Sequence, residues 1–168
     1  MRVAVTGTPG TGKTTASDLL ESDLDVIHLN DVIKGEGLTQ GTDEERDTVI
    51  ADLDAVVSWL EDKDDVIVES HLAHHLPVDR VVVLRCHPET IERRLAEREE
   101  SAATAKENAE SEALDVILTE AVEAHGLEHV YEIETTDRSP EAVAEEIEAV
   151  LADEREPSAG TVSYVEYL

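Results

Sequence analysis

A glycine-rich stretch near the amino terminus contains residue types that bind the phosphates of a nucleotide. Residues 7–14 read Gly-Thr-Pro-Gly-Thr-Gly-Lys-Thr and fit the pattern G-x-x-x-x-G-K-[ST] without a mismatch. We expect Lys13 to reach the β- and γ-phosphates, and the Thr14 hydroxyl to bind Mg²⁺. Backbone N–H groups can approach phosphate oxygens closely where side chains are absent. The glycines that permit this approach are Gly7, Gly10 and Gly12.

An acidic residue and a histidine follow an apolar run in the middle of the chain. Val66-Ile67-Val68 is followed by Glu69, which is the form of a strand that holds a carboxylate beside Mg²⁺. Acidic residues are 41 of 168, so an acid at this position also has a sizeable chance of being accidental. His71 follows the predicted strand end, where ligands bind in parallel sheets, and could orient a nucleophile or contact phosphate.

Three nearby histidines raise the alternative of a zinc site. They are His71, His74 and His75. The chain's single cysteine, Cys86, does not lie with them, and Pro77 disfavours a long helix that could present them together. Zinc is therefore the weaker interpretation of this cluster.

Basic side chains are informative because they are scarce. Arg94 and Arg98 are four residues apart, so a helix would place them on one face. There their guanidinium groups could surround a migrating phosphoryl group. Surface ion pairs with neighbouring glutamates are the alternative, and we favour it for Arg93. Arg85 ends an apolar run and could serve either purpose.

Strand-like and helix-like patterns alternate along the chain. Short apolar runs predict strands, and apolar residues at helical spacing, or a proline that opens a helix, predict helices between them. The predicted strands are residues 2–6, 25–28, 66–69, 81–84 and 130–133. The predicted helices include residues 13–20, 50–60, 88–95, 114–122 and 140–151. This order predicts an α/β fold with a mostly parallel five-stranded sheet and helices on both faces.

A polar stretch between the second and third strands is interrupted by glycines. Gly35, Gly37 and Gly41 predict a mobile segment there. Asp43 and Arg46 lie within it and could face a second substrate. A less regular tail, residues 154–168, could dock on the body of the protein or on a partner.

The composition is strongly acidic, with 41 acidic against 13 basic residues and a net charge of −28. Such a balance often indicates disorder, but 40% hydrophobic residues and periodic segments argue against it here. Adaptation to a salt-rich cytoplasm explains it better, since molar salt screens self-repulsion within a few ångströms. The charge also argues against strong direct binding of nucleic acid.

The chain has few features of secreted or membrane proteins. No stretch approaches the roughly 18 apolar residues of a membrane span, and a strand pattern begins almost at Met1 rather than a signal peptide. Cys86, as the single cysteine, cannot form an internal disulfide. We therefore expect a cytoplasmic protein of one domain spanning residues 1–168.

In this order, these motifs resemble the adenylate kinase isoenzyme 6 family. The resemblance covers nearly the whole chain and is more specific than a phosphate loop alone. Besides residues 7–15, it rests on Asp43-Glu44-Glu45-Arg46, Glu69-Ser70-His71, Val82-Val83-Leu84-Arg85, Arg94-Leu95-Ala96-Glu97-Arg98 and Glu107-Asn108-Ala109-Glu110-Ser111-Glu112.

The resemblance implies a nucleoside-monophosphate-kinase fold that acts on MgATP and on AMP or another NMP. It implies an NMP-binding segment at about residues 28–52, where we place Asp31, Asp43 and Arg46 against the substrate. It also implies a short lid at about residues 98–108. ATP-binding residues carried over are Gly7, Gly10, Gly12, Lys13, Thr14, Thr15, Arg94 and Arg98. Lys13, His71 and Arg98 are the expected catalytic residues, and Thr14 and Glu69 the expected Mg²⁺ ligands.

The same resemblance implies ATPase activity and a second role. Members of that family act in late maturation of the small ribosomal subunit and its rRNA, and bind the eleventh small-subunit protein on the platform of the pre-ribosomal particle. A partner-gated ATPase that works mainly as an assembly factor is therefore the alternative to an adenylate kinase. A small P-loop kinase acting on another metabolite is a third possibility.

The chain departs from the family pattern at three places. Glu69 is one methylene longer than the aspartate common in the acid-x-His motif. Glu99 follows Arg98 where the family often has glycine. Thr104 stands where a lysine is common, and Lys106, two residues later, is a candidate replacement.

Overall fold

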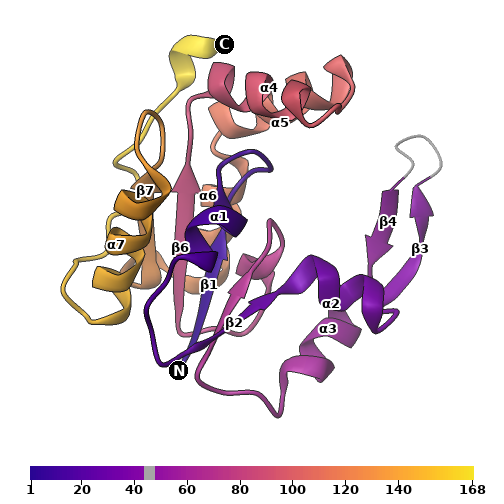
Figure 1. The fold of residues 1–168 in the computed structure, drawn as a ribbon, viewed down its shortest axis with the longest axis vertical. Coiled ribbons are helices and arrows are strands. Elements are labelled where there is room, and N and C mark those ends of the chain that lie inside the picture. The colour runs from indigo at the N-terminus through magenta and orange to yellow at the C-terminus, as the bar shows by residue number, and fades with distance from the viewer. Residues whose placement is uncertain (44–47) are drawn as a thin grey trace.

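The computed structural model describes residues 1–43 and 48–168 (Figure 1), and the side chains of residues 1–41 and 50–168. Arg46, a predicted substrate residue, lies outside the described residues. In the described part of the chain, no helix is long and apolar enough to cross a membrane.

The centre of the fold is a sheet of five parallel strands, as predicted. Its order is β2-β5-β1-β6-β7. The bounds are β2 Asp25–His28, β5 Val66–Glu69, β1 Arg2–Thr6, β6 Arg80–Arg85 and β7 Val130–Glu134. The central strands are apolar on both sides because both faces of the sheet are covered. All five strands end at one edge, so loops distant in sequence meet there.

Helices pack on both faces of the sheet. Val3 and Val5 of β1 point into a core closed by α1 (Lys13–Asp18) and α7 (Pro140–Leu151). Ala4 points the other way, into a core closed by α2, α3 and α6. Those helices span Leu29–Gly35, Leu53–Leu60 and Val116–His125. Alternate residues of one strand therefore stabilise two separate hydrophobic layers.

One tryptophan, Trp59, lies on α3 and packs partly buried against the second of these layers. The Lys63 ammonium lies 3.9 Å from the centre of its ring. A cation over an indole face is attracted by the ring quadrupole, so this contact holds the end of α3 to the turn after it.

Two helices stand beyond the carboxyl ends of the strands. α4 (Pro88–Glu97) and α5 (Ala102–Ala113) lie side by side above the phosphate loop in Figure 1. A small apolar cluster joins them and includes Ile91, Leu95 and Ala105. The turn between them contains Glu99, whose φ of 65° is in the left-handed region.

The glycine-interrupted stretch contains a hairpin that sequence patterns did not predict. β3 (Thr39–Asp43) pairs antiparallel with β4 (Thr48–Ala51), with an irregular register between Thr39 and Gly41. Figure 1 shows this hairpin projecting away from the central sheet. It was missed because β3 has no apolar run of the kind that marks a buried strand, and because Ile50 was assigned to the predicted helix 50–60. Ile50 lies in β4 instead, and the helix begins at Leu53.

The helix predicted for residues 114–122 begins later than expected. Leu114 is exposed rather than part of its buried face, and Asp115 has a left-handed φ of 56° that separates α5 from α6. The Asp115 carboxylate accepts a hydrogen bond from Arg85 at 2.5 Å. This contact lies at the break between α5 and α6.

The carboxyl-terminal tail packs on β7. Ser158 N–H donates to Val130 O at 3.1 Å, and the N–H groups of Gly160 and Thr161 both donate to Glu132 Oε1. Farther along, Tyr164 is buried, with its ring over the Arg85 guanidinium. The described tail therefore docks on the body of the chain, which was one of the two expectations.

Candidate functional site

The phosphate loop connects the end of β1 to the start of α1. A Cβ on Gly7 would lie 2.7 Å from Leu84 O and 2.9 Å from Thr11 Oγ1, so a side chain would collide with backbone. Gly7 also has a φ of 151°, and Gly12, which precedes α1, has a φ of 88°. Glycine is therefore required where the loop passes the neighbouring strand and where it enters the helix.

Lys13 is buried at the first position of α1. Its ammonium donates to Gly7 O at 2.9 Å and to Thr8 O at 3.2 Å. Burial lowers its pKa from 10.5 to about 8, Glu69 opposes this shift, and Arg98 adds to it. The ammonium is held inside the loop where phosphate oxygens are expected.

The two predicted metal ligands meet at the carboxyl ends of β1 and β5. The Thr14 hydroxyl donates to Glu69 Oε1 at 3.0 Å, and Glu69 is buried. The extra methylene of Glu69 therefore still brings its carboxylate to Thr14. Two oxygens at this spacing suit Mg²⁺, which commonly binds through one or two protein groups plus water and phosphate.

His28 belongs to this site but was not singled out from the sequence. Its Nδ1 lies 2.8 Å from Glu69 Oε1, and its Nε2 lies 2.8 Å from Asp18 Oδ1. The hydrogen bond to Glu69 is the main cause that raises the His28 pKa, burial opposes this shift, and the hydrogen bond to Asp18 adds to it. The available signal was its place at the end of a predicted strand, at the edge where ligands bind.

His71 lies two residues beyond Glu69, at the start of the loop after β5. Burial lowers its pKa to about 4, and the Lys13 charge acts in the same direction. The ring is therefore neutral at neutral pH, and it can donate one hydrogen bond and accept another rather than supply a positive charge.

Arg94 and Arg98 approach the phosphate loop from α4. Arg94 Nη1 donates to Gly10 O at 3.0 Å and lies 3.6 Å from Cys86 Sγ. Arg98 follows the last residue of α4 and is exposed. Both side chains line a cavity of about 230 Å³ beside the loop. Its other lining residues are Gly12, Thr15, Ala16, Thr135, Arg138, Pro140 and Val143.

Arg85, for which two purposes were open, lies in a buried charge cluster. Its guanidinium contacts Glu132 at 2.7 Å, Asp115 at 2.5 Å and Glu112 at 3.3 Å. Glu112 also accepts from the Thr8 hydroxyl and from Cys86 N–H. Burial raises the pKa of Glu112, while Arg85 opposes this shift. The cluster therefore ties the phosphate loop to α5 and β7, and Arg85 acts as its structural centre.

Of the residues predicted to hold a second substrate, the structure describes the side chain of Asp31 alone. Asp31 is exposed in the first turn of α2, and Asp43 ends β3. Lys106, a candidate for the lid, is exposed on α5, with its ammonium 4.0 Å from Glu110. Neither Asp31 nor Lys106 contacts the phosphate loop through a hydrogen bond or ion pair between described residues.

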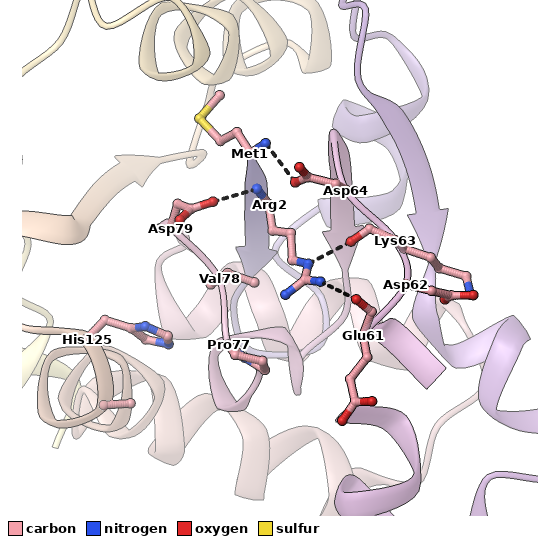
Figure 2. Close-up of a pocket in the computed structure, with 11 residues that line it drawn as sticks. Met1, Arg2, Glu61, Asp62, Lys63, Asp64, Pro77, Val78, Asp79 and His125 are labelled. Carbon is pink, nitrogen blue, oxygen red and sulfur yellow. Dashed lines mark hydrogen bonds and ion pairs between the residues drawn. The ribbon is translucent and has the colours of Figure 1, made fainter. Parts of the chain in front are cut away.

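A larger hollow, about 810 Å³, lies at the opposite edge of the sheet (Figure 2). The amino-terminal ammonium there contacts Asp64 at 2.8 Å, and Arg2 N–H donates to Asp79. The Arg2 guanidinium donates to the carbonyl groups of Lys63 and Glu61. These polar groups of the hollow are paired with one another, and they lie far from the phosphate loop. The larger volume of the hollow is therefore no evidence of a functional site.

The sheet order, the glycine loop and the Thr14–Glu69 pair define a P-loop kinase-like α/β protein. Two solved structures share this fold. One is a shikimate kinase from Aquifex aeolicus (TM-score 0.51, 16% identity, 91% of this chain and 97% of that one). The other is a sulfotransferase from Alicyclobacillus acidocaldarius (TM-score 0.52, 13% identity, 98% and 86%).

Sequence relatives define the family more narrowly. A family model described as an AAA domain matches residues 3–115. Proteins with the printed name "Putative adenylate kinase" are 63% identical in Natronomonas pharaonis and 60% identical in Halobacterium salinarum, each over the full length of both chains. One from Methanosarcina acetivorans is 43% identical over 90% of this chain and 86% of its own. The chain belongs to the family of these proteins.

Proposed function

We propose that this protein is an adenylate kinase, which transfers the terminal phosphoryl group reversibly from MgATP to AMP. The family and the fold support a nucleotide kinase. The observation that carries the proposal is the convergence of Lys13, Thr14 and Glu69 at the end of the parallel sheet. Such a set has the cation and the oxygen ligands that phosphoryl transfer requires.

Each residue has a proposed part in the reaction. Lys13 would exchange its bonds to loop carbonyls for bonds to phosphate oxygens, and Arg98 would add positive charge as the group moves. Thr14 and Glu69 would hold Mg²⁺, which neutralises phosphate charge and orients the β- and γ-oxygens. His71, being neutral, would position the acceptor or a water molecule.

The cavity between α4 and α7 suits the nucleoside part of ATP. It adjoins the phosphate loop at Gly12 and Thr15, and its polar lining includes Arg94 and Arg98. We propose that residues 28–52 bind the NMP, with Asp31, Asp43 and Arg46 as its contacts. We also propose that residues 98–108 close over the nucleotides as a short lid within one kinase domain.

The test is ADP formation from MgATP with and without AMP, in about 2–3 M KCl to screen the acidic surface. We expect AMP-dependent formation of two ADP for each ATP consumed, and Lys13→Ala should retain less than about a tenth of the wild-type rate. Arg93→Ala is the matched control, because Arg93 is an exposed arginine on α4 that does not line the cavity. Slow hydrolysis indifferent to AMP would contradict the kinase proposal.

That contrary result would favour the alternative, a partner-gated ATPase in small-subunit assembly. Its support is the resemblance to the isoenzyme 6 family, and the net charge of −28, which favours encounter with a basic ribosomal protein at low salt. Adding the purified platform protein to the same assay distinguishes the two. Stimulation of hydrolysis by that protein, and not by AMP, would identify the assembly role as primary.

A further inference from the structure

Two imidazoles and a carboxylate converge behind the proposed nucleotide site. His74 and His75 lie on the 3₁₀ turn η1 (Ala73–His75), and Glu120 lies on α6. His74 Nε2 is 3.7 Å from Glu120 Oε1, and His75 Nε2 is 3.5 Å from Glu120 Oε2. The three potential ligand atoms lie within 4.8 Å of one another.

We propose that His74, His75 and Glu120 bind a divalent transition-metal ion, for which Zn²⁺ is the best match. Two histidines and one glutamate form a known donor set for zinc sites that keep a position open to water. Ligands bound tetrahedrally at about 2.1 Å stand roughly 3.4 Å apart. The two nitrogen–oxygen distances are close to this separation, although each involves a different oxygen of Glu120. The carboxylate therefore faces both imidazoles, and side-chain movement would bring one oxygen and both nitrogens onto the same ion.

His74 provides the strongest evidence for the site, because an ordinary ion pair does not explain why one of its ring nitrogens is buried without a hydrogen-bond partner among the described residues. The side chain is 1% exposed, its Nδ1 lies 2.8 Å from Thr6 Oγ1, and its Nε2 has no hydrogen-bond partner among the described residues. Burying a polar nitrogen without a hydrogen bond destabilises a fold, so a ligand at Nε2 would remove that cost. With the Nδ1 proton donated to Thr6, Nε2 carries the lone pair that a metal requires.

A contact already joins the two elements that carry the ligands. His125 Nε2 donates to His74 O at 2.7 Å, which links α6 to η1. The His75 and Glu120 side chains are 32% and 39% exposed, so an ion can enter from solvent and keep a water ligand. The site uses other ligands than the Mg²⁺ pair, Thr14 and Glu69, and bound metal would fasten η1 to α6.

The test is titration of untagged, chelator-stripped protein with Co²⁺ in molar KCl and excess Mg²⁺, which occupies sites selective for hard ions. We expect saturation at one equivalent, with the strong visible absorption of four-coordinate Co²⁺, and loss of this absorption when Zn²⁺ is added. Glu120→Gln and His75→Asn should each weaken Co²⁺ binding by about tenfold or more. Zn²⁺ should also raise the melting temperature of the wild type.

Two matched variants control for changes unrelated to the site. Glu123→Gln makes the same substitution at an exposed position of α6, and His129→Asn removes an exposed histidine. Both should bind Co²⁺ as the wild type does. Failure to saturate near one equivalent, or equal affinity in Glu120→Gln, His75→Asn and the controls, would overturn the proposal. Circular dichroism of each variant verifies the fold, and all four substituted positions are exposed or partly exposed, so none of the variants removes the buried His74.

Discussion

At the scale of single residues, Lys13 stands out because its buried ammonium donates to two backbone carbonyl oxygens and forms no ion pair with another described residue. The bonds to Gly7 O and Thr8 O do not offset the cost of burying an ammonium group, which is why its pKa falls to about 8. Below about pH 8 the lysine is charged in both the folded and the unfolded chain, so the fold carries this cost. The cost disappears between about pH 8 and 10.5, the ordinary pKa of lysine.

From this we predict that MgATP binding takes up protons near pH 8.5. Phosphate charge beside Lys13 should raise the pKa of its side chain. At pH 8.5 the side chain is largely a neutral amine in the free protein, and it becomes a protonated ammonium in the complex. Calorimetric titrations in buffers of different ionisation enthalpy measure this uptake directly. The affinity for MgATP should weaken from pH 8 to 10, by at most about tenfold per pH unit. Lys13→Ala should lose the uptake, and a wild type without it would contradict the assignment.

A second prediction separates binding from chemistry at His71. If the neutral ring orients the acceptor or a water molecule, His71→Ala should lower hydrolysis of ATP more than it lowers ATP affinity. Single-turnover rates and equilibrium binding are the measurements. His87→Ala is the control for a histidine with a structural role, because His87 caps the start of α4 by accepting a hydrogen bond from Glu89 N–H. Equal losses in rate and affinity for His71→Ala would indicate a structural role.

At the scale of elements, the turn between α4 and α5 joins the proposed ATP cavity to the proposed lid. Glu99 takes a left-handed conformation in this turn, with a φ of 65°. The other described non-glycine residues with positive φ are aspartates, whose short side chains tolerate this region better. Glu99 therefore holds this turn at a cost in backbone strain, and glycine, which the sequence resemblance led us to expect after Arg98, would avoid that cost.

We predict that Glu99→Gly stabilises the protein, whereas Glu100→Gly destabilises it. Glycine at position 99 should relieve about 1 kcal/mol of backbone strain in the folded state. About half of this gain should be lost, because glycine also increases the conformational entropy of the unfolded chain. Position 100 lacks a positive φ, so glycine brings only the entropic cost there. Chemical denaturation should separate the two variants by about 1 kcal/mol. Equal stabilities would show that Glu99 is unstrained.

The elements also show what sequence patterns can and cannot predict. The phosphate loop and the five strands were predicted because their signals are local, a motif of eight residues and short apolar runs. The Thr8–Glu112 bond joins residues 104 apart, and the His28–Glu69 bond joins residues 41 apart. Such contacts depend on strand order and helix packing, which leave no fixed spacing in a single sequence. The β3–β4 hairpin was missed because β3 has no apolar pattern, and because Ile50 of β4 also fits the helical spacing of the residues that follow it.

At the scale of the whole molecule, the net charge of −28 acts on every element. Like charges repel more in the compact fold than in an extended chain, so the fold loses stability where salt is dilute. Local ion pairs, such as that of Arg138 with Glu146 at 2.8 Å, offset little of this repulsion among acidic side chains, because basic residues are few.

We therefore predict a strong dependence of stability on salt. The melting temperature should rise by about 10 °C or more between about 0.1 M and about 3 M KCl, since the screening length falls from about 10 Å to below 3 Å. Scanning calorimetry across the series measures it. Sucrose at matched water activity is the control, because it favours compact states without screening charge. A flat melting temperature in KCl would contradict this account.

Trp59 gives the molecule an optical reporter of its own. It is the single tryptophan of the chain, and the sequence contains no phenylalanine, so the indole emission comes from one known place on α3. The Lys63 ammonium over its ring makes that emission sensitive to any shift between α3 and the turn after it. Fluorescence of the unlabelled protein can thus follow movement beside the proposed NMP segment in real time, separately from events at the phosphate loop.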